Sequence, residues 1–397
     1  MTGPEVADDE RRTPRRARAG RATFPGVRAS GVVDHVDLDA GGQWTPDGGF
    51  WAVVVDFEGR LRAWRFAAVD RREPDEEASR PGEWVGPEPW SWRSSLDREA
   101  YLGAVESVRA AVREGEVYQA NICRVLEAPL PAAAGGPDPW ALTAVLHRGN
   151  PAPYSATLHV PPVDGDAGCE RDEGVWIVSA SPELFLEVRD GTVMSGPIKG
   201  TAPSSAGLGA KDEAENIMIT DLVRNDLQRV CLPGTVEVVD LLAHEEHPGL
   251  VHLVTRVRGR LREARPIWES LREATFPPAS VSGAPKAAAL DIIRSLEPVD
   301  RGPYCGAIGW WDADSGEAVL AVGIRTFWWT SEVGGTLRFG TGAGITWGSN
   351  AAQEWQETEL KAARLVALAS GGMRRGASAP PVRGEQDGQP DEGEGSR

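Results

Sequence analysis

The stretch FWAVVVDFEGRLRAWRFAAV (residues 50–69) sets the fold class of this chain. Two runs rich in Val, Phe and Trp, residues 50–57 and 61–69, are separated by the short segment EGR, which is typical of a β-hairpin. The strands of a hairpin pair antiparallel, and the rest of the chain shows no regular strand–helix–strand repeat. The sequence therefore predicts an α+β fold with antiparallel or mixed sheets flanked by helices.

Further segments extend this pattern along the chain. Strands are expected over residues 116–128, 174–188 and 319–329, and a strand followed by a glycine turn is expected over residues 336–350. Helices are expected over residues 96–115, 211–230, 268–276, 283–298 and 351–370. Helices and strands thus alternate irregularly, which favours hairpins over parallel βαβ units.

Composition divides the chain into four parts. Residues 1–25 and 371–397 are rich in Gly, Pro and charged residues, and we expect them to be disordered tails. Residues 26–95 form a strand-rich N-terminal part packed on the core, and residues 96–370 form the main domain.

The overall charge and the cysteines exclude several classes of protein. A net charge of −17 disfavours nucleic acid as a partner. No apolar run approaches the roughly 20 residues that span a bilayer, so no membrane association is expected. The four cysteines form no C-x-x-C pair, which is typical of reduced thiols in a cytoplasmic protein.

Lysine is rare in this chain. There are 38 Arg but only four Lys, at positions 199, 211, 286 and 361. Lys199 lies in GPIKGTAPSS (residues 196–205). A lysine nucleophile must be neutral, and with a reference pKa of about 10.4 its deprotonation near pH 7.5 costs about 4 kcal/mol. Burial or nearby positive charge can remove that cost, whereas Arg cannot usefully lose its proton. A solvated surface lysine is the alternative.

Acidic residues on two expected helices could bind a metal. Glu354, Glu357 and Lys361 are spaced three and four apart and share one helical face, which equally fits a solvated ion-pair face. Glu215 lies in the first turn of the helix after Lys211, where acids often complement the helix dipole. Mg²⁺ takes one or two protein carboxylates, so Glu215 and Glu357 could form a site if they converge.

Arg325 and a set of glycines could bind an anion. Strand alternation places Arg325 on the same face as the small residues Ala321 and Gly323, which leaves room for a carboxylate at the guanidinium. An ordinary ion pair is the alternative. Glycines 340, 342 and 344 precede a helix, and bare amides at such a turn can receive a carboxylate or phosphate, although a plain tight turn fits as well.

The histidine-rich segment HEEHPGLVH (residues 244–252) has a partial metal pattern. The spacing H-x-x-H with adjacent glutamates suggests zinc, but Pro248 and Gly249 break the helix that such a protease site requires. A zinc protease is therefore excluded.

Many segments together resemble the chorismate-utilising enzymes, which include anthranilate, aminodeoxychorismate, isochorismate and salicylate synthases. The resemblance covers residues 100–368 in unbroken order. It rests on GEVYQANI, SASPELFL, GPIKGTAP, AENIMITDLVRNDLQRV, HLVTRVRGRL, SVSGAPKAAALDIIRSLEP, GPYCGAIGW, VGIRTF, GAGI and QETELKA. It implies an anthranilate synthase component I-like fold, with residues 96–370 as a chorismate-binding catalytic domain and the active site between two halves.

Two positions distinguish the subgroups of this family. Anthranilate synthases carry Ala where this chain has Lys199, aminodeoxychorismate synthases carry Lys there, and isochorismate-forming members use a lysine where this chain has Gln119. The combination resembles aminodeoxychorismate synthase component I. Ser282 departs from the usual Thr before GAPK, and the tryptophan-binding L-L-E-S motif of regulated anthranilate synthases is not evident.

The resemblance also implies roles for individual residues. Lys199 corresponds to a nucleophile, Glu183 to an acid or base at the ring hydroxyl, His252 to a histidine near the site and Lys361 to a further cation. Glu215 and Glu357 correspond to Mg²⁺ ligands. The positions that hold the substrate chorismate correspond to Gln119, Gly200, Thr201, Tyr304, Arg325, Gly342, Ala343 and Gly344.

The expected partners follow from the same resemblance. The product would be 4-amino-4-deoxychorismate for 4-aminobenzoate and folate synthesis. No cysteine has the G-x-C-x-G form of a glutaminase nucleophile, so ammonia is expected from a separate glutamine amidotransferase subunit. Anthranilate synthase component I is the nearest alternative, an isochorismate or salicylate synthase is disfavoured by Gln119, and a non-catalytic binding paralogue is the alternative from another class.

Overall fold

The structure is a computed structural model that describes residues 17–71, 82–132, 136–163, 172–202, 204–247, 250–262 and 267–371. Its helices are α1 (Arg98–Glu114), α2 (Pro139–Gly149), α3 (Ala210–Gln228), α4 (Ile267–Thr275), α5 (Lys286–Leu296) and α6 (Ala351–Ala369). Its strands are β1 (Arg18–Phe24), β2 (Val27–Leu38), β3 (Phe50–Val55), β4 (Leu61–Asp70), β5 (Arg93–Ser94), β6 (Gln119–Pro129), β7 (Tyr154–Val160), β8 (Val175–Ser181), β9 (Leu184–Arg189), β10 (Thr192–Gly196), β11 (Ile198–Ala202), β12 (Glu237–His247), β13 (Leu250–Arg260), β14 (Gly283–Ala284), β15 (Ala307–Asp312), β16 (Glu317–Val322), β17 (Thr326–Thr330) and β18 (Thr336–Ile345).

The strands form one curled sheet in which every ladder between described strands is antiparallel. Following the pairings from one end, the order is β6, β18, β17, β8, β7, β1, β2, β4, β3, β15, β16, β9, β10, β13 and β12. The short strands β5 and β14 pair with β6, and β11 pairs with β13. The predicted α+β class with antiparallel pairing is confirmed.

The hairpin at residues 50–69 forms as expected and joins the N-terminal strands to the rest of the sheet. Val55 lies opposite Leu61 across β3 and β4, and β3 also pairs with β15. The tail expected over residues 1–25 is wrong for its last part, because Arg18–Phe24 pairs with both β2 and β7 as strand β1. Residues 1–16 and 372–397 lie outside the described part of the chain.

Two of the predicted strands are broken in the middle. The strand expected over residues 174–188 divides into β8 and β9 at Pro182, and the strand expected over residues 319–329 divides into β16 and β17 before Arg325. Proline cannot donate to a ladder, and Arg325 has a left-handed φ of 53°. Because β9 pairs with β16 and β8 pairs with β17, both breaks lie at the same level of the sheet. The expected alternation from Ala321 through Arg325 on one face is therefore wrong.

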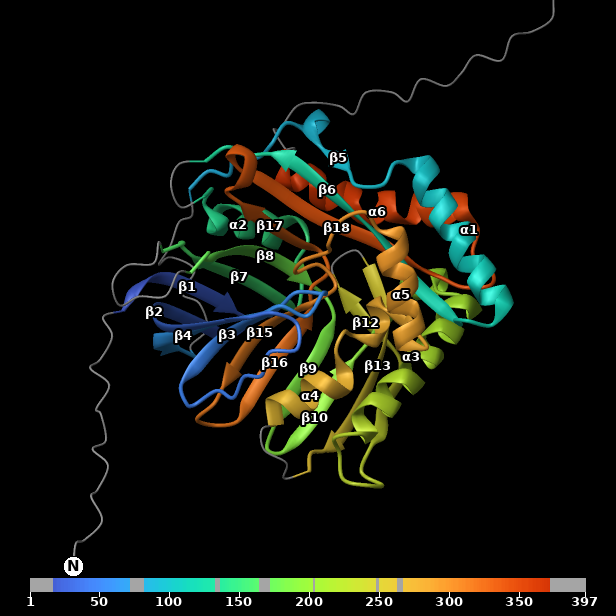
Figure 1. Cartoon of the computed structure of the whole chain (residues 1–397), viewed down its shortest axis with the longest axis horizontal. Helices are drawn as coiled ribbons and strands as arrows, with labels where there is room; N and C mark the ends of the chain where they lie inside the picture. Colours follow the sequence, from blue (N-terminus) through green and yellow to red (C-terminus); the bar gives the residue numbers. More distant parts are fainter. Residues whose placement is uncertain are drawn as a thin grey trace, which may run out of the picture.

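A third break lies close to these two along the pairing order. Pro197 separates β10 from β11, which then pairs along β13. Helix α3 packs on β11 and β13, near one end of the strand order, whereas α6 packs on β18 near the other end. Figure 1 shows α3 beside β12 and β13 and α6 along β18. Lys211 of α3 pairs with Glu354 of α6, so side chains of the two helices meet.

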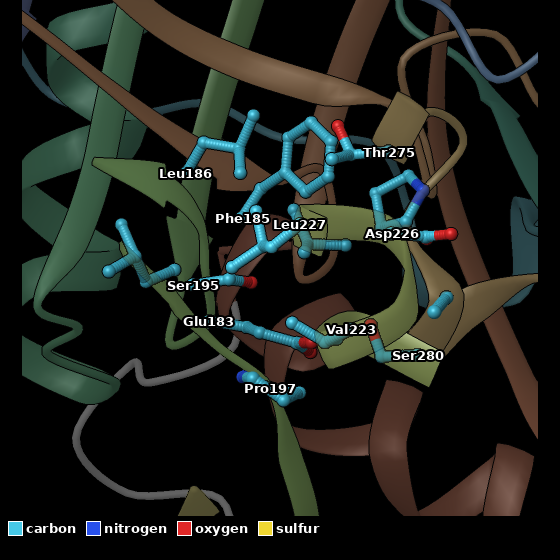
Figure 2. A pocket seen from close by; sticks show the side chains of 14 residues that line it. Glu183, Phe185, Leu186, Ser195, Pro197, Val223, Asp226, Leu227, Thr275 and Ser280 are labelled. Atoms are coloured by element: carbon cyan, nitrogen blue, oxygen red, sulfur yellow. The ribbon is translucent and has the colours of Figure 1, made fainter. Parts of the chain in front are cut away.

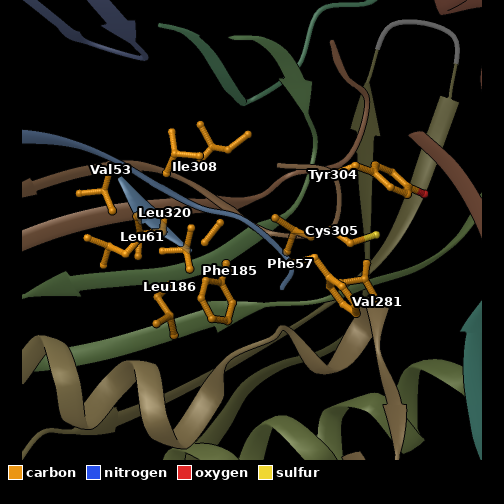
Figure 3. Close-up of a cluster of buried hydrophobic side chains, with 14 of the residues drawn as sticks. Val53, Phe57, Leu61, Phe185, Leu186, Val281, Tyr304, Cys305, Ile308 and Leu320 are labelled. Carbon is orange, nitrogen blue, oxygen red and sulfur yellow. The ribbon is translucent and has the colours of Figure 1, made fainter. Parts of the chain in front are cut away.

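Buried side chains form two hydrophobic clusters. The larger cluster includes side chains from β3, β9, β15 and β16, part of which is shown in Figure 3. The smaller cluster lies where α2 and α6 cover β8, β17 and β18, with Leu142, Phe327 and Leu365 buried. Trp310, Trp311 and most other tryptophans are buried, as expected of core residues.

The ends of two helices follow capping residues in the sequence, whereas a few helices and strands were not predicted. Asp97 caps α1 and Gly115 ends it with a left-handed φ, while the Asn350 side chain accepts a hydrogen bond from the Gln353 amide at the start of α6. Helix α2 and strands β12 and β13 lie in segments where no element was expected. In the described part of the chain, no helix combines the length and apolarity needed to cross a bilayer.

Candidate active site

Lys199 lies on β11, and its ammonium group is turned into the protein. The Nζ atom donates a hydrogen bond to the backbone oxygen of Ser280 at 3.0 Å. A Cβ atom placed on Gly344 of β18 would lie 3.7 Å from the same Nζ. Lys199 therefore connects β11 with β18, although these strands are near opposite ends of the pairing order.

The surroundings of Lys199 shift its proton equilibrium towards the neutral amine. Burial lowers the pKa of its ammonium, and the positive charge of Lys361 lowers it further. The carboxylates of Glu215 and Glu183 oppose this, but the pKa remains below its ordinary value. A neutral amine is the form that can act as a nucleophile.

Glu183 lies at the break between β8 and β9 and is almost completely buried, with 3% of its surface exposed. Burial raises its pKa to about 7, although hydrogen bonds from Ser280 and the Ile198 amide and the charge of Lys199 act in the opposite direction. Figure 2 shows the Glu183 carboxyl group close to Ser280. A carboxyl group with a pKa near 7 can donate a proton at neutral pH.

A small cavity of about 20 Å³ lies beside Glu183 (Figure 2). Its walls are mostly apolar, with Phe185, Leu186, Val223 and Leu227 among them. A cavity of this size holds about one water molecule and cannot hold a substrate of many atoms. Its apolar lining explains why the charged form of Glu183 is disfavoured.

Arg325 lies at the break between β16 and β17, which pair with β9 and β8 respectively. Its guanidinium group forms no hydrogen bond or ion pair with any other part of the chain that the structure describes. Burial lowers its pKa and the charge of Glu183 raises it. A partly enclosed guanidinium without an ion-pair partner can bind a carboxylate by donating two parallel hydrogen bonds to it.

The glycines of β18 do not form the expected turn, because Thr336–Ile345 is one continuous strand. They are required by close contacts with three side chains. A Cβ on Gly340 would lie 2.0 Å from the Tyr304 ring, one on Gly342 would lie 2.6 Å from the Cys123 sulfur, and one on Gly344 would lie 2.3 Å from Gln119 Nε2. The predicted anion site at a glycine turn is therefore wrong in its geometry.

Three carboxylates and two further lysines extend the site across α3 and α6. Glu215 is on α3, whereas Glu354 and Glu357 are on α6. Lys211 Nζ lies 3.5 Å from Glu354 Oε1 and 3.8 Å from Glu215 Oε1. Lys361 Nζ lies 2.7 Å from Glu357 Oε1 and donates to the Gly342 oxygen at 3.0 Å.

Electrostatic effects show that the acids of the two helices lie near one another. Burial raises the pKa of Glu215, and the charges of Glu357 and Glu354 are further causes of that rise, against Lys199 and Lys211. Burial would also raise the pKa of Glu357, but its ion pair with Lys361 lowers it below the usual value. The charge of Glu357 on α6 thus contributes to the raised pKa of Glu215 on α3, and the convergence of the two side chains at one metal stays a prediction.

The sequence of residues 60–367 matches the family model described as chorismate binding enzyme. The chain belongs to this family.

Relatives within the chorismate binding enzyme family are of more than one type. The chain is 36% identical over 279 residues to anthranilate synthase component 1 of Saccharolobus solfataricus, covering 67% of this chain and 61% of that relative. It is 36% identical over 288 residues to aminodeoxychorismate synthase component 1 of Klebsiella aerogenes, covering 70% and 59% respectively. The chain thus matches about three fifths of the length of these relatives.

The fold is also that of the family. The crystal structure of anthranilate synthase component I from Streptococcus pneumoniae superposes with a TM-score of 0.65 at 22% identity, covering 92% of this chain and 95% of that one. The predicted anthranilate synthase component I-like fold is therefore confirmed.

The remaining residues assigned from the family resemblance are placed as follows. Gly200 has a left-handed φ of 82°, and a Cβ there would lie 2.8 Å from the Asp212 Cβ. Thr201 pairs with His252 across β11 and β13, and His252 is buried. The Tyr304 hydroxyl accepts a contact from Cys123 Sγ of β6 at 3.9 Å.

The donor set of the site fits a hard divalent cation. Within the described residues, no group of three or more His, Cys, Asp or Glu side chains is arranged to hold a metal. Mg²⁺, however, is usually bound through one or two carboxylates, with water and substrate oxygens completing its shell. Glu215 and Glu357 supply such carboxylates from two helices. The ammonium group of Lys211, itself a cation, already pairs with Glu215 and Glu354.

Three residues of the site were not assigned a role from the sequence. Ser280 bonds both Glu183 and Lys199, but it lies 81 residues from Lys199 and no local pattern indicates the contact. Glu354 and Lys211 could have been found, because each lies one helical turn from a residue that was assigned, Glu357 and Glu215 respectively.

Proposed function

We propose that this chain is the chorismate-transforming component of an aminodeoxychorismate synthase. In this proposal it converts chorismate and ammonia to 4-amino-4-deoxychorismate in the presence of Mg²⁺. The observation that carries the proposal is Lys199, a rare lysine with a lowered pKa whose ammonium faces Gly344 and Ser280 inside the site.

The substrate would be held through its two carboxylates. Arg325 offers a guanidinium without an ion-pair partner among the described residues, and Lys361 offers an ammonium beside Gly342 of β18. Gln119 is buried, and its Oε1 atom has no hydrogen-bond partner within the described residues, so it can accept a hydrogen bond from a substrate hydroxyl or amine. Because the chain carries a net charge of −17, these local cations are needed to attract a dianion.

The chemical steps divide between Lys199 and Glu183. The neutral amine of Lys199 forms a bond to C2 of the ring, the two conjugated ring double bonds shift, and the bond from C4 to its hydroxyl oxygen breaks. Glu183 gives its proton to that oxygen, which leaves as water. Ammonia then bonds to C4, the two double bonds shift back, and the bond from C2 to the Lys199 nitrogen breaks. The proton that the attacking ammonia loses returns to Glu183, so that both residues are restored.

Mg²⁺ would be held by Glu215 and Glu357 and would neutralise substrate carboxylate charge when bound. The ammonia would come from a separate glutamine amidotransferase subunit. Three cysteines, Cys123, Cys231 and Cys305, are buried, which does not suit a glutaminase nucleophile that must meet glutamine. The product would serve 4-aminobenzoate and folate synthesis.

Anthranilate synthase component I is the second candidate, because a relative of that type is as similar to the chain as the aminodeoxychorismate type. Purified protein with chorismate, Mg²⁺ and an ammonium salt should yield 4-amino-4-deoxychorismate by chromatography and no fluorescent anthranilate. Mass spectrometry of the quenched reaction should find an adduct on the peptide containing Lys199. Formation of anthranilate as the main product, or full activity in Lys199→Ala, contradicts the proposal.

A further inference from the structure

We propose that Lys211 is the resident counter-ion of the carboxylates on α3 and α6, and that it leaves them when a divalent cation binds. The inference rests on the proposed function in one respect, namely that Mg²⁺ is the cation concerned.

The position of Lys211 supports this role. Its ammonium lies 3.8 Å from Glu215 Oε1 and 3.5 Å from Glu354 Oε1, so a single cation attracts carboxylates on two different helices. Both distances exceed the 2.7–2.9 Å of a tight charge-assisted hydrogen bond. The side chain is 60% exposed, whereas Glu354 is only 3% exposed. The carboxylates are thus largely enclosed, whereas the cation between them is mostly exposed and more than 3 Å from either oxygen.

The other lysines are held more firmly. Lys199 donates to Ser280 O at 3.0 Å, and Lys361 lies 2.7 Å from Glu357 and donates to Gly342 O. Lys286, which lies outside the site, donates at 3.0 Å to both Asp226 Oδ2 and the Thr275 oxygen. Among the four lysines of the chain, Lys211 is therefore the one suited to displacement.

The charges of the site lead to the same conclusion. With Lys199 as the neutral amine, the ammonium groups of Lys211 and Lys361 face the carboxylates of Glu215, Glu354 and Glu357, and the charges of the two helices influence one another. The charges of the site are thus nearly balanced before any ligand enters. A divalent cation alone leaves an excess of positive charge beside two ammonium groups, which is unfavourable unless one of them moves away.

Two consequences follow for binding. Lys211 competes with the metal, so it lowers the affinity of the free protein for Mg²⁺. A dianionic substrate restores the balance of charge, so Mg²⁺ and chorismate bind with positive coupling, each strengthening the other.

The test compares Lys211→Met with the wild-type chain by calorimetric titration with Mg²⁺ alone, without chorismate. Removal of the competing ammonium should tighten Mg²⁺ binding about tenfold, within the usual range of coupling between charged ligands. Lys211→Arg should keep the weak affinity because it keeps the charge. Lys286→Met is the matched control and should leave the Mg²⁺ affinity unchanged.

Thermal unfolding provides a second readout that needs no catalysis. Metal-free Lys211→Met should unfold at a lower temperature than wild type, because Glu215 and Glu354 lose their counter-ion, and Mg²⁺ should raise its Tm by more than it raises that of wild type. Equal Mg²⁺ affinity in wild type and Lys211→Met overturns this inference alone. If neither protein binds Mg²⁺, with or without chorismate, the metal of the proposed function is wrong and this inference fails with it.

Discussion

Two cations contact the same chain segments but are surrounded differently: Arg301 is buried and Lys199 is half-buried. Arg301 is 1% exposed and donates to both carboxylate oxygens of Glu297 and to the backbone oxygens of Val281 and Asn121. Among the described residues, Lys199 donates one hydrogen bond, to the backbone oxygen of Ser280. The guanidinium of Arg301 is thus paired with a carboxylate, whereas the ammonium of Lys199 is not.

The two cations share their supporting elements. Ser280 serves Lys199 and the next residue, Val281, serves Arg301. On β6, the amide of Gln119 reaches Gly344 near Lys199, while the oxygen of Asn121 accepts from Arg301. Arg301 therefore holds the segment that contains Ser280, the residue that Lys199 contacts.

The largest effect that tests this comparison is on Lys199. Lys199→Met removes the proposed nucleophile, so formation of 4-amino-4-deoxychorismate should fall on the order of a thousandfold or more, about 4 kcal/mol of transition-state stabilisation. The free energy of unfolding should not fall, because a buried ammonium with one backbone partner adds little to stability. Product chromatography and urea unfolding measure the two quantities. A marked loss of stability with retained turnover would reverse the roles of the two cations.

Arg301→Met should instead act on stability. It leaves the Glu297 carboxylate buried without its partner, which costs about 3–5 kcal/mol of unfolding free energy. Arg294→Met is the matched control, since Arg294 and Asp291 form an ion pair with both side chains 72% exposed, which contributes about 0–1 kcal/mol. Urea unfolding followed by tryptophan fluorescence compares the variants. Equal losses in both would show that Arg301 is not a stabilising pair.

Glu183→Gln tests separately how the buried carboxyl group affects the free energy of unfolding and how it affects the reaction. Because burial raises the pKa of Glu183 from 4.5 to about 7, the native state binds this proton more tightly than the unfolded state. Stability is therefore lost as pH rises from 4.5 to 7, by about 3 kcal/mol. The variant should be more stable than wild type at pH 8 and equal to it at pH 4.5, as measured by unfolding at both pH values.

The same variant should change the pH dependence of the reaction. The acid acts when protonated, so kcat/KM of wild type should fall as pH rises through about 7. Glu183→Gln should be about 10²–10⁴-fold slower, and its kcat/KM should show no such decline near pH 7. A wild-type profile without a decline near that pH would indicate that Glu183 is not the acid.

The smallest effect concerns the shape of the site. Gly344→Ala places a methyl group 2.3 Å from Gln119 Nε2 and 3.7 Å from Lys199 Nζ, so the amide must move, at a cost of about 1–3 kcal/mol of unfolding free energy. The KM for chorismate should rise as well. Gly348→Ala, where a Cβ meets nothing within 4 Å, should change neither quantity. Thermal unfolding and steady-state kinetics on both variants make the comparison.

Much of the fold could be predicted from local sequence, because the signals are local. The hairpin at residues 50–69 and the helices ending at Gly115 and beginning after Asn350 rest on turn and capping chemistry. The broken strands could not be predicted, since Pro182 and the left-handed Arg325 have meaning only when their strands are seen to pair.

The site was predictable to a lesser degree. Motif order indicated Lys199, Glu215 and Glu357, and the structure places their charges within reach of one another. Ser280 escaped notice because its role comes from a contact between distant segments. The glycine-rich end of β18 was taken for a turn, although its glycines make room for side chains of β6 and for Tyr304.

The curled sheet has a consequence for how the chain folds. Lys199 of β11 lies beside Gly344 of β18, a strand near the far end of the pairing order, so the contact closes the sheet upon itself. Closure between such distant segments carries a large entropic penalty, and proteins dominated by nonlocal pairing fold slowly. We therefore expect the amine to become reactive only in the last stage of refolding, after most tryptophan fluorescence has recovered.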